Sequence, residues 1–147
     1  MSPAKRLGPT TVRLTTPTSI PALRVSRWAR NARRRLGLWR GRIVISTVDL
    51  ATSRRLNTTY RHRRRATNVL SFTYANRSTP VTVADADAEI ILCPDVVRRE
   101  ARASHQTYPD RFRFLLEHGL IHLLGLDHHT TADARRWQRY ERRLSRP

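Results

Sequence analysis

The chain has 147 residues, enough for one domain with a hydrophobic core, and a formal net charge of +18 at pH 7. Its single cysteine excludes an internal disulfide, and no apolar run is long enough to predict a membrane-spanning helix, so we expect a cytoplasmic protein without a membrane partner. Almost all of its cations are arginines, whose planar fork matches phosphate oxygens; this favours a nucleic-acid partner, although a solubilising surface would carry the same charge.

The N-terminal half is predicted to alternate strands with helices. Residues 1–9 hold two prolines, a glycine and two cations, and we expect a flexible tail there, ahead of a single domain over 10–147. Alternating or β-branched apolar residues favour strands, and apolar residues at helical spacing favour helices. These patterns predict, in turn, a strand, a helix, a strand and a helix at 11–16, 20–38, 42–47 and 50–61.

Both of these helices are preceded by residues that favour a helix start. Thr18 and Ser19 come before the first helix, and Asp49 comes before the second; all three are typical N-cap residues. In the first helix, four apolar positions are expected near one face: Leu23, Trp28, Ala32 and Leu36.

The C-terminal half is predicted to hold two strands, joined by polar residues, and then three helices. These elements follow a basic loop and are expected at 69–74, 88–93, 95–106, 108–125 and 131–144. In the longest helix Pro109 lies in the first turn and Gly125 ends the helix. The order of elements predicts an α+β fold, in which a small mixed sheet of about four strands is packed with helices.

Three histidines lie close together in the stretch HGLIHLLGLDH, residues 118–128. His118 and His122 are four residues apart on a predicted helix, so both project from one face. Gly125 breaks the helix and lets the chain turn back, so that His128 can approach the same point. Three imidazoles leave one position of a tetrahedral zinc ion open, as in catalytic sites. We therefore expect one zinc ion per chain, although nickel, copper and iron also accept imidazole ligands.

Metzincin proteases share this histidine spacing, but they need a glutamate after the first histidine as general base and a methionine beneath the metal. Gly119 occupies the position of that glutamate, and Met1 is the only methionine. Glu117 precedes the first histidine and would point away from the metal on a helix. The sequence therefore argues against a protease.

The histidine motif resembles another family much more closely. HGLIHLLGLDH is similar to the H-G-x-L-H-L-x-G-Y-D-H signature of the YbeY family of bacterial rRNA-maturation endoribonucleases. A second block, LNTTYRHRRRATNVLSF at 56–72, resembles the family's L-N-x-x-Y-R-x(5)-T-D-V-L-S-F, with Asn68 where aspartate is common. A third block, AEIILC at 88–93, is a weaker match, and Glu141 keeps the family's glutamate spacing in the last predicted helix.

This resemblance implies a zinc-dependent endoribonuclease that prefers single-stranded RNA. It implies action on ribosomal RNA of the small subunit, notably at its 3′ end, and in ribosome quality control, with no DNA partner. By motif match, the metal ligands are His118, His122 and His128, and Arg61 is the functional arginine. In such an enzyme the neighbouring arginines are expected to contact the RNA backbone without reading bases: Arg63, Arg64 and Arg65.

Two other functions fit parts of the sequence. A ribosome-associated RNA-binding factor with a non-catalytic metal site would carry the same +18 charge. A metal-dependent hydrolase of another substrate would carry the same histidines. The open three-histidine arrangement favours an enzyme over the first alternative, and the basic surface favours RNA over the substrates of the second.

Overall fold

The computed structural model describes residues 6–74, 85–126 and 130–147. Strands and helices follow one another in the predicted order. Along the chain they are β1 (Thr10–Arg13), α1 (Ala22–Leu36), β2 (Ile43–Thr47), α2 (Leu50–Arg61), β3 (Val69–Thr73), β4 (Ala88–Leu92), α3 (Pro94–Ala103), α4 (Tyr108–His122) and α5 (Thr131–Ser145). In these described parts, no helix is long and apolar enough to cross a membrane.

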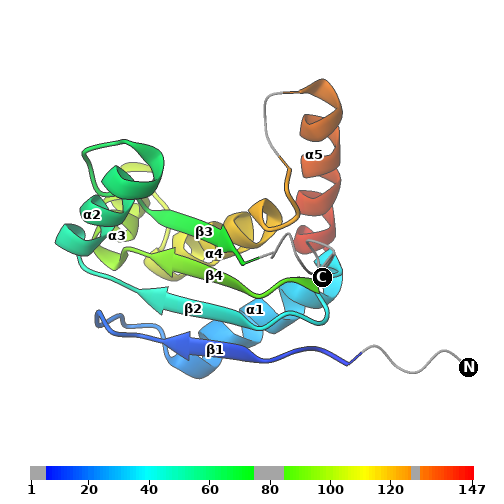
Figure 1. Ribbon diagram of the computed structural model, residues 1–147. Helices are drawn as coiled ribbons and strands as arrows, with labels where there is room; N and C mark the ends of the chain where they lie inside the picture. Colours follow the sequence, from blue (N-terminus) through cyan, green and yellow to red (C-terminus); the bar gives the residue numbers. More distant parts are fainter. Residues whose placement is uncertain (1–5, 75–84, 127–129) are drawn as a thin grey trace, which may run out of the picture.

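Within the described parts of the chain, four strands form one mixed sheet in the order β1-β2-β4-β3 (Figure 1). β1, β2 and β4 are parallel, and β3 pairs antiparallel with β4 at the edge. The central strands β2 and β4 are rich in isoleucine, and their register sets Ile45 beside Ile90, both fully buried. This sheet, together with the five helices of the described residues, confirms the predicted α+β class.

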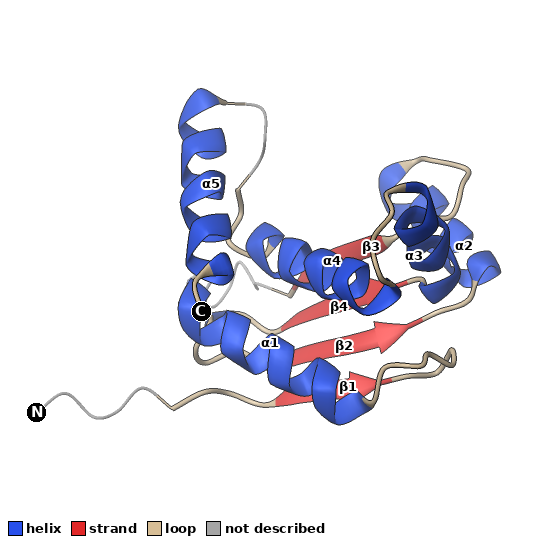
Figure 2. Ribbon diagram, turned by 180° about the vertical axis from the view of Figure 1, so that it is seen from behind, coloured by secondary structure: helices blue, strands red, loops and turns tan. Residues whose placement is uncertain are grey.

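Helices α1 and α4 lie across one face of the sheet, and α5 packs against both of them at one end (Figure 2). Helix α4 packs against β3 and β4 of the sheet and against the helices α1, α3 and α5, so it buries side chains on more than one side. Its buried side chains include Phe112, Leu116 and Leu120. This burial fixes the rotation of α4, and with it the direction in which His118 and His122 point.

Helix α4 begins as predicted but ends earlier than the expected position 125. The Thr107 side chain caps its start by accepting from the backbone N–H of Asp110, and Pro109 lies in its first turn. After His122, the backbone bonds tighten to an i→i−3 pattern, and Gly125 takes a left-handed φ of 73°. The glycine therefore turns the chain, as predicted, but the helix itself stops at the second histidine.

Two expectations about α1 are wrong. The helix starts after Pro21, whose side chain offers no cap, and the Thr18 hydroxyl instead lies 2.6 Å from the Tyr108 hydroxyl. Leu23 is 81% exposed, because the buried face is centred on Val25, two residues or about 200° further round the helix. By contrast, Asp49 caps α2 as predicted, accepting from the backbone N–H of Thr52 at 2.8 Å.

The buried face of α1 includes a charged residue, Arg33, which is 0% exposed. Its guanidinium group donates hydrogen bonds to oxygens of the chain before β1 and of the loop after α1: those of Gly8, Pro9, Thr10, Leu38, Trp39 and Gly41. Burial, followed by the charge of Arg30, lowers the pKa of Arg33 to about 10, so it stays charged at neutral pH. Arg33 thus holds Gly8 and Pro9, the end of the predicted tail, against the domain; residues 1–5 of that tail lie outside the described residues.

Replacing Arg33 with methionine is expected to lower the free energy of unfolding by at least about 3 kcal/mol, because several buried carbonyls lose a charged donor. Urea unfolding followed by circular dichroism measures this loss. Arg34→Met is the matched control, since Arg34 is exposed on the same turn and should change stability by no more than about 0.5 kcal/mol. Equal effects of the two substitutions would show that the Arg33 network does not stabilise the fold.

Candidate active site

His118 and His122 lie one turn apart on α4 and project from the same side of the helix. Their Nε2 atoms are 3.1 Å apart, and their rings meet nearly edge to face with centroids 4.8 Å apart. Two imidazole ligands of a tetrahedral zinc ion, each about 2.05 Å from the metal, would have nitrogens about 3.3 Å apart. The pair therefore fits two adjacent positions of such an ion.

The third predicted ligand, His128, lies outside the described residues. Within 6–74, 85–126 and 130–147, no three histidine, cysteine or carboxylate side chains come together as a metal site. Cys93, at the end of β4, is 1% exposed and takes the structural role expected of a small buried residue. The structure thus brings together two of the three predicted histidines.

Aromatic side chains surround the histidine pair. The Trp137 ring of α5 lies 4.8 Å from the His118 ring and 4.7 Å from the His122 ring, centroid to centroid. Trp137 is only 4% exposed, and its indole N–H donates to the Glu141 carboxylate at 2.8 Å. Phe114, one turn before His118, lies 6.0 Å from its ring. These contacts restrict the rotamers of both imidazoles and exclude bulk water from one side of the pair.

Gly119 faces the sheet and not the histidines. A Cβ at this position would lie 3.0 Å from the Ser71 hydroxyl oxygen and 3.2 Å from a methyl group of Ile90. The Ser71 hydroxyl also donates to the Gly119 carbonyl at 3.0 Å, which ties α4 to β3. A glutamate here would be forced into the core, so this fold has no room for the general base that metzincins carry at that position.

Arg61 lies beside the histidines, although the two segments are far apart in the sequence. It is the last residue of α2, and it lines a cavity of about 210 Å³ together with His118 and His122. The other residues around this cavity are Asn68, Val69, Ser71, Arg111, Phe114 and Leu115. Burial, and then the charge of Arg63, lowers the pKa of Arg61, but an arginine remains a cation at neutral pH.

The loop after α2 is held in place by two buried polar side chains of that helix. The Ser53 hydroxyl bonds to both the carbonyl and the N–H of Thr67 at 2.9 Å, and the Asn57 amide donates to the Arg65 carbonyl at 2.8 Å. His62 starts the loop with a left-handed φ of 57°. The loop is therefore ordered, and the predicted RNA-contacting arginines are exposed on it without lining the cavity: Arg63, Arg64 and Arg65.

Sequence reasoning missed a second cation of this cavity, Arg111. Its guanidinium group is ion-paired with Glu100 of α3 at 3.0 Å and lies 5.1 Å from the centroid of the Phe114 ring. Glu100 also accepts a hydrogen bond from the Asn68 amide at 2.9 Å. The aspartate that is common at this position of the YbeY-family motif could not donate this bond. Arg111 stands two helical turns before His118, so helical spacing could have placed it on the same face.

Comparison with known proteins places these features in a family. The sequence model described as Endoribonuclease YbeY matches residues 21–146. The chain belongs to the YbeY family. An Endoribonuclease YbeY of Paracidovorax citrulli is 40% identical over 124 residues, which cover 84% of this chain and 75% of that protein. The Endoribonuclease YbeY of Bordetella pertussis is 38% identical over 128 residues, covering 83% and 79%.

A solved structure supports the fold of this YbeY-family chain. The solution structure of a Thermotoga maritima protein covers 92% of this chain and 88% of its own, with a TM-score of 0.52 and 20% sequence identity. Membership of the family confirms the resemblance seen in the two motifs. It also favours an endoribonuclease over the non-catalytic RNA-binding factor and over the hydrolase of another substrate.

Proposed function

We propose that this YbeY-family chain is a zinc-dependent endoribonuclease that cleaves single-stranded ribosomal RNA in the cytoplasm. Its role would be maturation of the 3′ end of the small-subunit RNA and ribosome quality control. The observation that carries this proposal is the cavity that joins Arg61 of α2 to His118 and His122 of α4. An open cavity with two cations beside a histidine pair suits a phosphodiester substrate.

The metal would be held by His118 and His122 together with His128. When bound, zinc supplies a Lewis acid for a phosphoryl oxygen and activates water near neutral pH. The histidine pair fits this role because the two Nε2 atoms converge at 3.1 Å. Both imidazoles must be neutral to act as ligands, so metal content should fall in acid as they become protonated.

Arg61 and Arg111 would act on the phosphate itself. The Arg61 guanidinium can donate two parallel hydrogen bonds to phosphate oxygens and stabilise the charge that develops on them. Arg111 is already aligned by Glu100 and presents its guanidinium group to the same cavity. The nucleophile is either water or the ribose 2′-hydroxyl, and the two give different product ends.

The direct test is to incubate zinc-loaded protein with a single-stranded fragment of small-subunit RNA and to compare His122→Ala. The wild-type protein should cleave the fragment, and the variant should lose cleavage while keeping its fold by circular dichroism. Mapping the product ends distinguishes hydrolysis by water from attack by the 2′-hydroxyl. Absence of cleavage by verified zinc-loaded wild-type protein would favour the RNA-binding factor instead.

RNA affinity is expected to depend steeply on salt. The logarithm of the binding constant should fall with the logarithm of salt concentration by about 0.7 for each phosphate contact on a single strand. Replacing Arg63, Arg64 and Arg65 together with glutamine should reduce this slope by up to about 2 and leave zinc content unchanged. Fluorescence anisotropy at several salt concentrations measures the slope; an unchanged slope would remove these three residues from the RNA contacts.

A further inference from the structure

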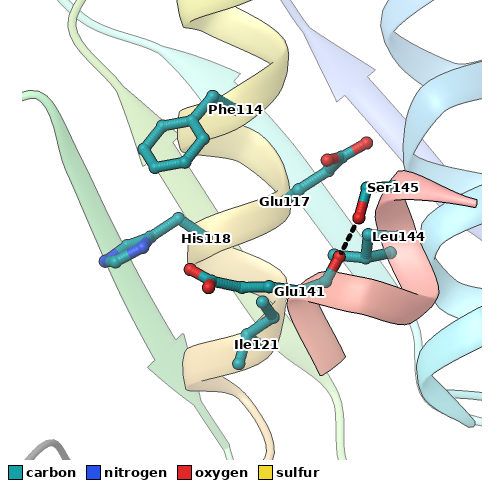
Figure 3. Close-up of a pocket in the computed structure, with 7 residues that line it drawn as sticks. All are labelled: Phe114, Glu117, His118, Ile121, Glu141, Leu144 and Ser145. Atoms are coloured by element: carbon teal, nitrogen blue, oxygen red, sulfur yellow. Dashed lines mark hydrogen bonds between the residues drawn. The ribbon is translucent and has the colours of Figure 1, made fainter. Parts of the chain in front are cut away.

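A second cavity lies on the other side of His118, between α4 and α5 (Figure 3). Its volume is about 280 Å³, near the lower limit of small-ligand sites, which suits a single planar ring system. Phe114 and His118 project from α4 on one side, and the Glu141 side chain extends from α5 toward His118. Ile121 and Leu144 supply apolar surface.

The two cavities share a wall. Phe114 and His118 line the second cavity and also line the one that contains Arg61 and Arg111. A ligand that occupies both would therefore pass directly beside the histidine pair. A nucleotide has this form, because its phosphate and its base are joined through one ribose.

The charges of the two cavities are opposite. Among the residues that the structure describes, the first is lined by Arg61 and Arg111, whereas the second is lined by Glu117 and Glu141 and by no lysine or arginine. Glu117 is ion-paired with Arg113, so Glu141 is the carboxylate that disfavours a phosphate and can accept hydrogen bonds from the N–H groups of a neutral base. The Phe114 ring, 44% exposed, offers an apolar aromatic surface for a base.

We infer that the second cavity binds a base of the RNA substrate next to the cleavage site and prefers guanine. This rests on the proposed endoribonuclease function and adds a specificity site to it. Guanine presents two adjacent N–H donors on its Watson–Crick edge, which match one carboxylate. Adenine and cytosine pair one such donor with a ring nitrogen acceptor, and uracil flanks its single N–H with carbonyl groups, so a carboxylate is repelled by part of each edge.

Glu141 is the carboxylate best placed to read this edge. The Trp137 indole donates to one of its oxygens at 2.8 Å, which fixes the side chain, and a carboxylate still has lone pairs for further donors. Glu117 is held differently, by an ion pair with Arg113 at 2.9 Å, and is directed away from His118 in Figure 3. Glu141 therefore sets the base preference, and Phe114 provides the surface beneath the ring.

The test compares binding of short 2′-O-methyl uridine oligonucleotides that carry one guanosine, one inosine or no substitution. Inosine keeps the N1–H of guanine but lacks the 2-amino group. Anisotropy with zinc-loaded wild-type protein should give at least about ten-fold tighter binding for guanosine than for inosine, as expected for one hydrogen bond to a charged group. Because binding is measured, the result does not depend on cleavage.

Two variants and one control test whether the second cavity causes the preference for guanosine. Glu141→Gln should bind guanosine and inosine oligonucleotides with similar affinity, since its amide cannot accept at both positions. Phe114→Ala should weaken binding of the guanosine oligonucleotide by at least about five-fold through lost stacking. Asp110→Asn, an exposed change at the far end of α4, should keep the wild-type preference.

Tight binding of the uridine oligonucleotide without any guanosine preference would overturn the inference and leave the proposed RNA substrate intact. A guanosine preference that persists in folded Glu141→Gln would also overturn the assignment to this cavity. Failure to bind any of the oligonucleotides would contradict both the inference and the proposed function.

Discussion

Zinc content is expected to fall to a small fraction of one ion per chain when His118 is replaced with alanine. His118 supplies one of the two convergent nitrogens, 3.1 Å from the Nε2 of His122. Loss of a side chain that only hydrogen-bonds to a metal ligand typically lowers metal affinity by roughly 10–100-fold. Removal of the ligand itself should lower the affinity by at least as much. Mass spectrometry of metals in untagged protein, purified without added zinc, measures the stoichiometry.

His105→Asn is the matched control for this measurement. His105 is exposed in the turn after α3 and has a left-handed φ of 53°, which asparagine tolerates better than alanine does. This variant should keep the zinc content of the wild-type protein. His128→Ala should behave like His118→Ala, and full zinc retention in either variant would remove that histidine from the ligand set.

The order of the elements could be predicted from the sequence because each carries a local pattern of its own. Strand β2 is short and β-branched, and Asp49 is a strong cap for α2. The position of His118 and His122 on one face could also be predicted from the sequence, since a four-residue spacing places two side chains on one helix face wherever the helix lies. The same logic would have found Arg111, which stands two turns earlier on α4.

What could not be read from the sequence depends on contacts between distant segments. Arg33 lies in a run of arginines that looks like a solvated surface, yet it is fully buried because the chain around Gly8 and Gly41 supplies the carbonyls that it binds. Leu23 has the apolarity of a core residue but faces solvent, because the position of α1 on the sheet decides which face is covered. Neither outcome follows from local pattern.

The candidate active site shows the same difference between what local patterns predict and what depends on contacts between distant segments. Family resemblance alone connected Arg61 with the histidines, whereas the fold provides the physical connection through the end of α2 and the loop tied to Ser53. Gly119 was recognised as the position of a missing base, but the reason for the glycine is visible only in its contact with Ser71 and Ile90. The second cavity, formed where α5 meets α4, has no signature in the sequence.

Arg61→Lys is expected to slow the cleavage of bound RNA by roughly 10²–10³-fold, the cost of removing one donor that stabilises transition-state charge. Lysine keeps the positive charge but cannot reproduce the planar two-point fork of arginine. Single-turnover cleavage at saturating protein measures this rate separately from binding.

Arg64→Lys provides the control, because Arg64 is exposed on the loop that follows and does not line the cavity. It should cleave bound RNA within a few-fold of the wild-type rate. Arg61→Lys should retain its zinc and most of its RNA affinity, so that the loss lies in the chemical step. If Arg61→Lys instead cleaves bound RNA as fast as Arg64→Lys and only binds it more weakly, then Arg61 is one more contact to the RNA backbone and has no part in stabilising the transition state.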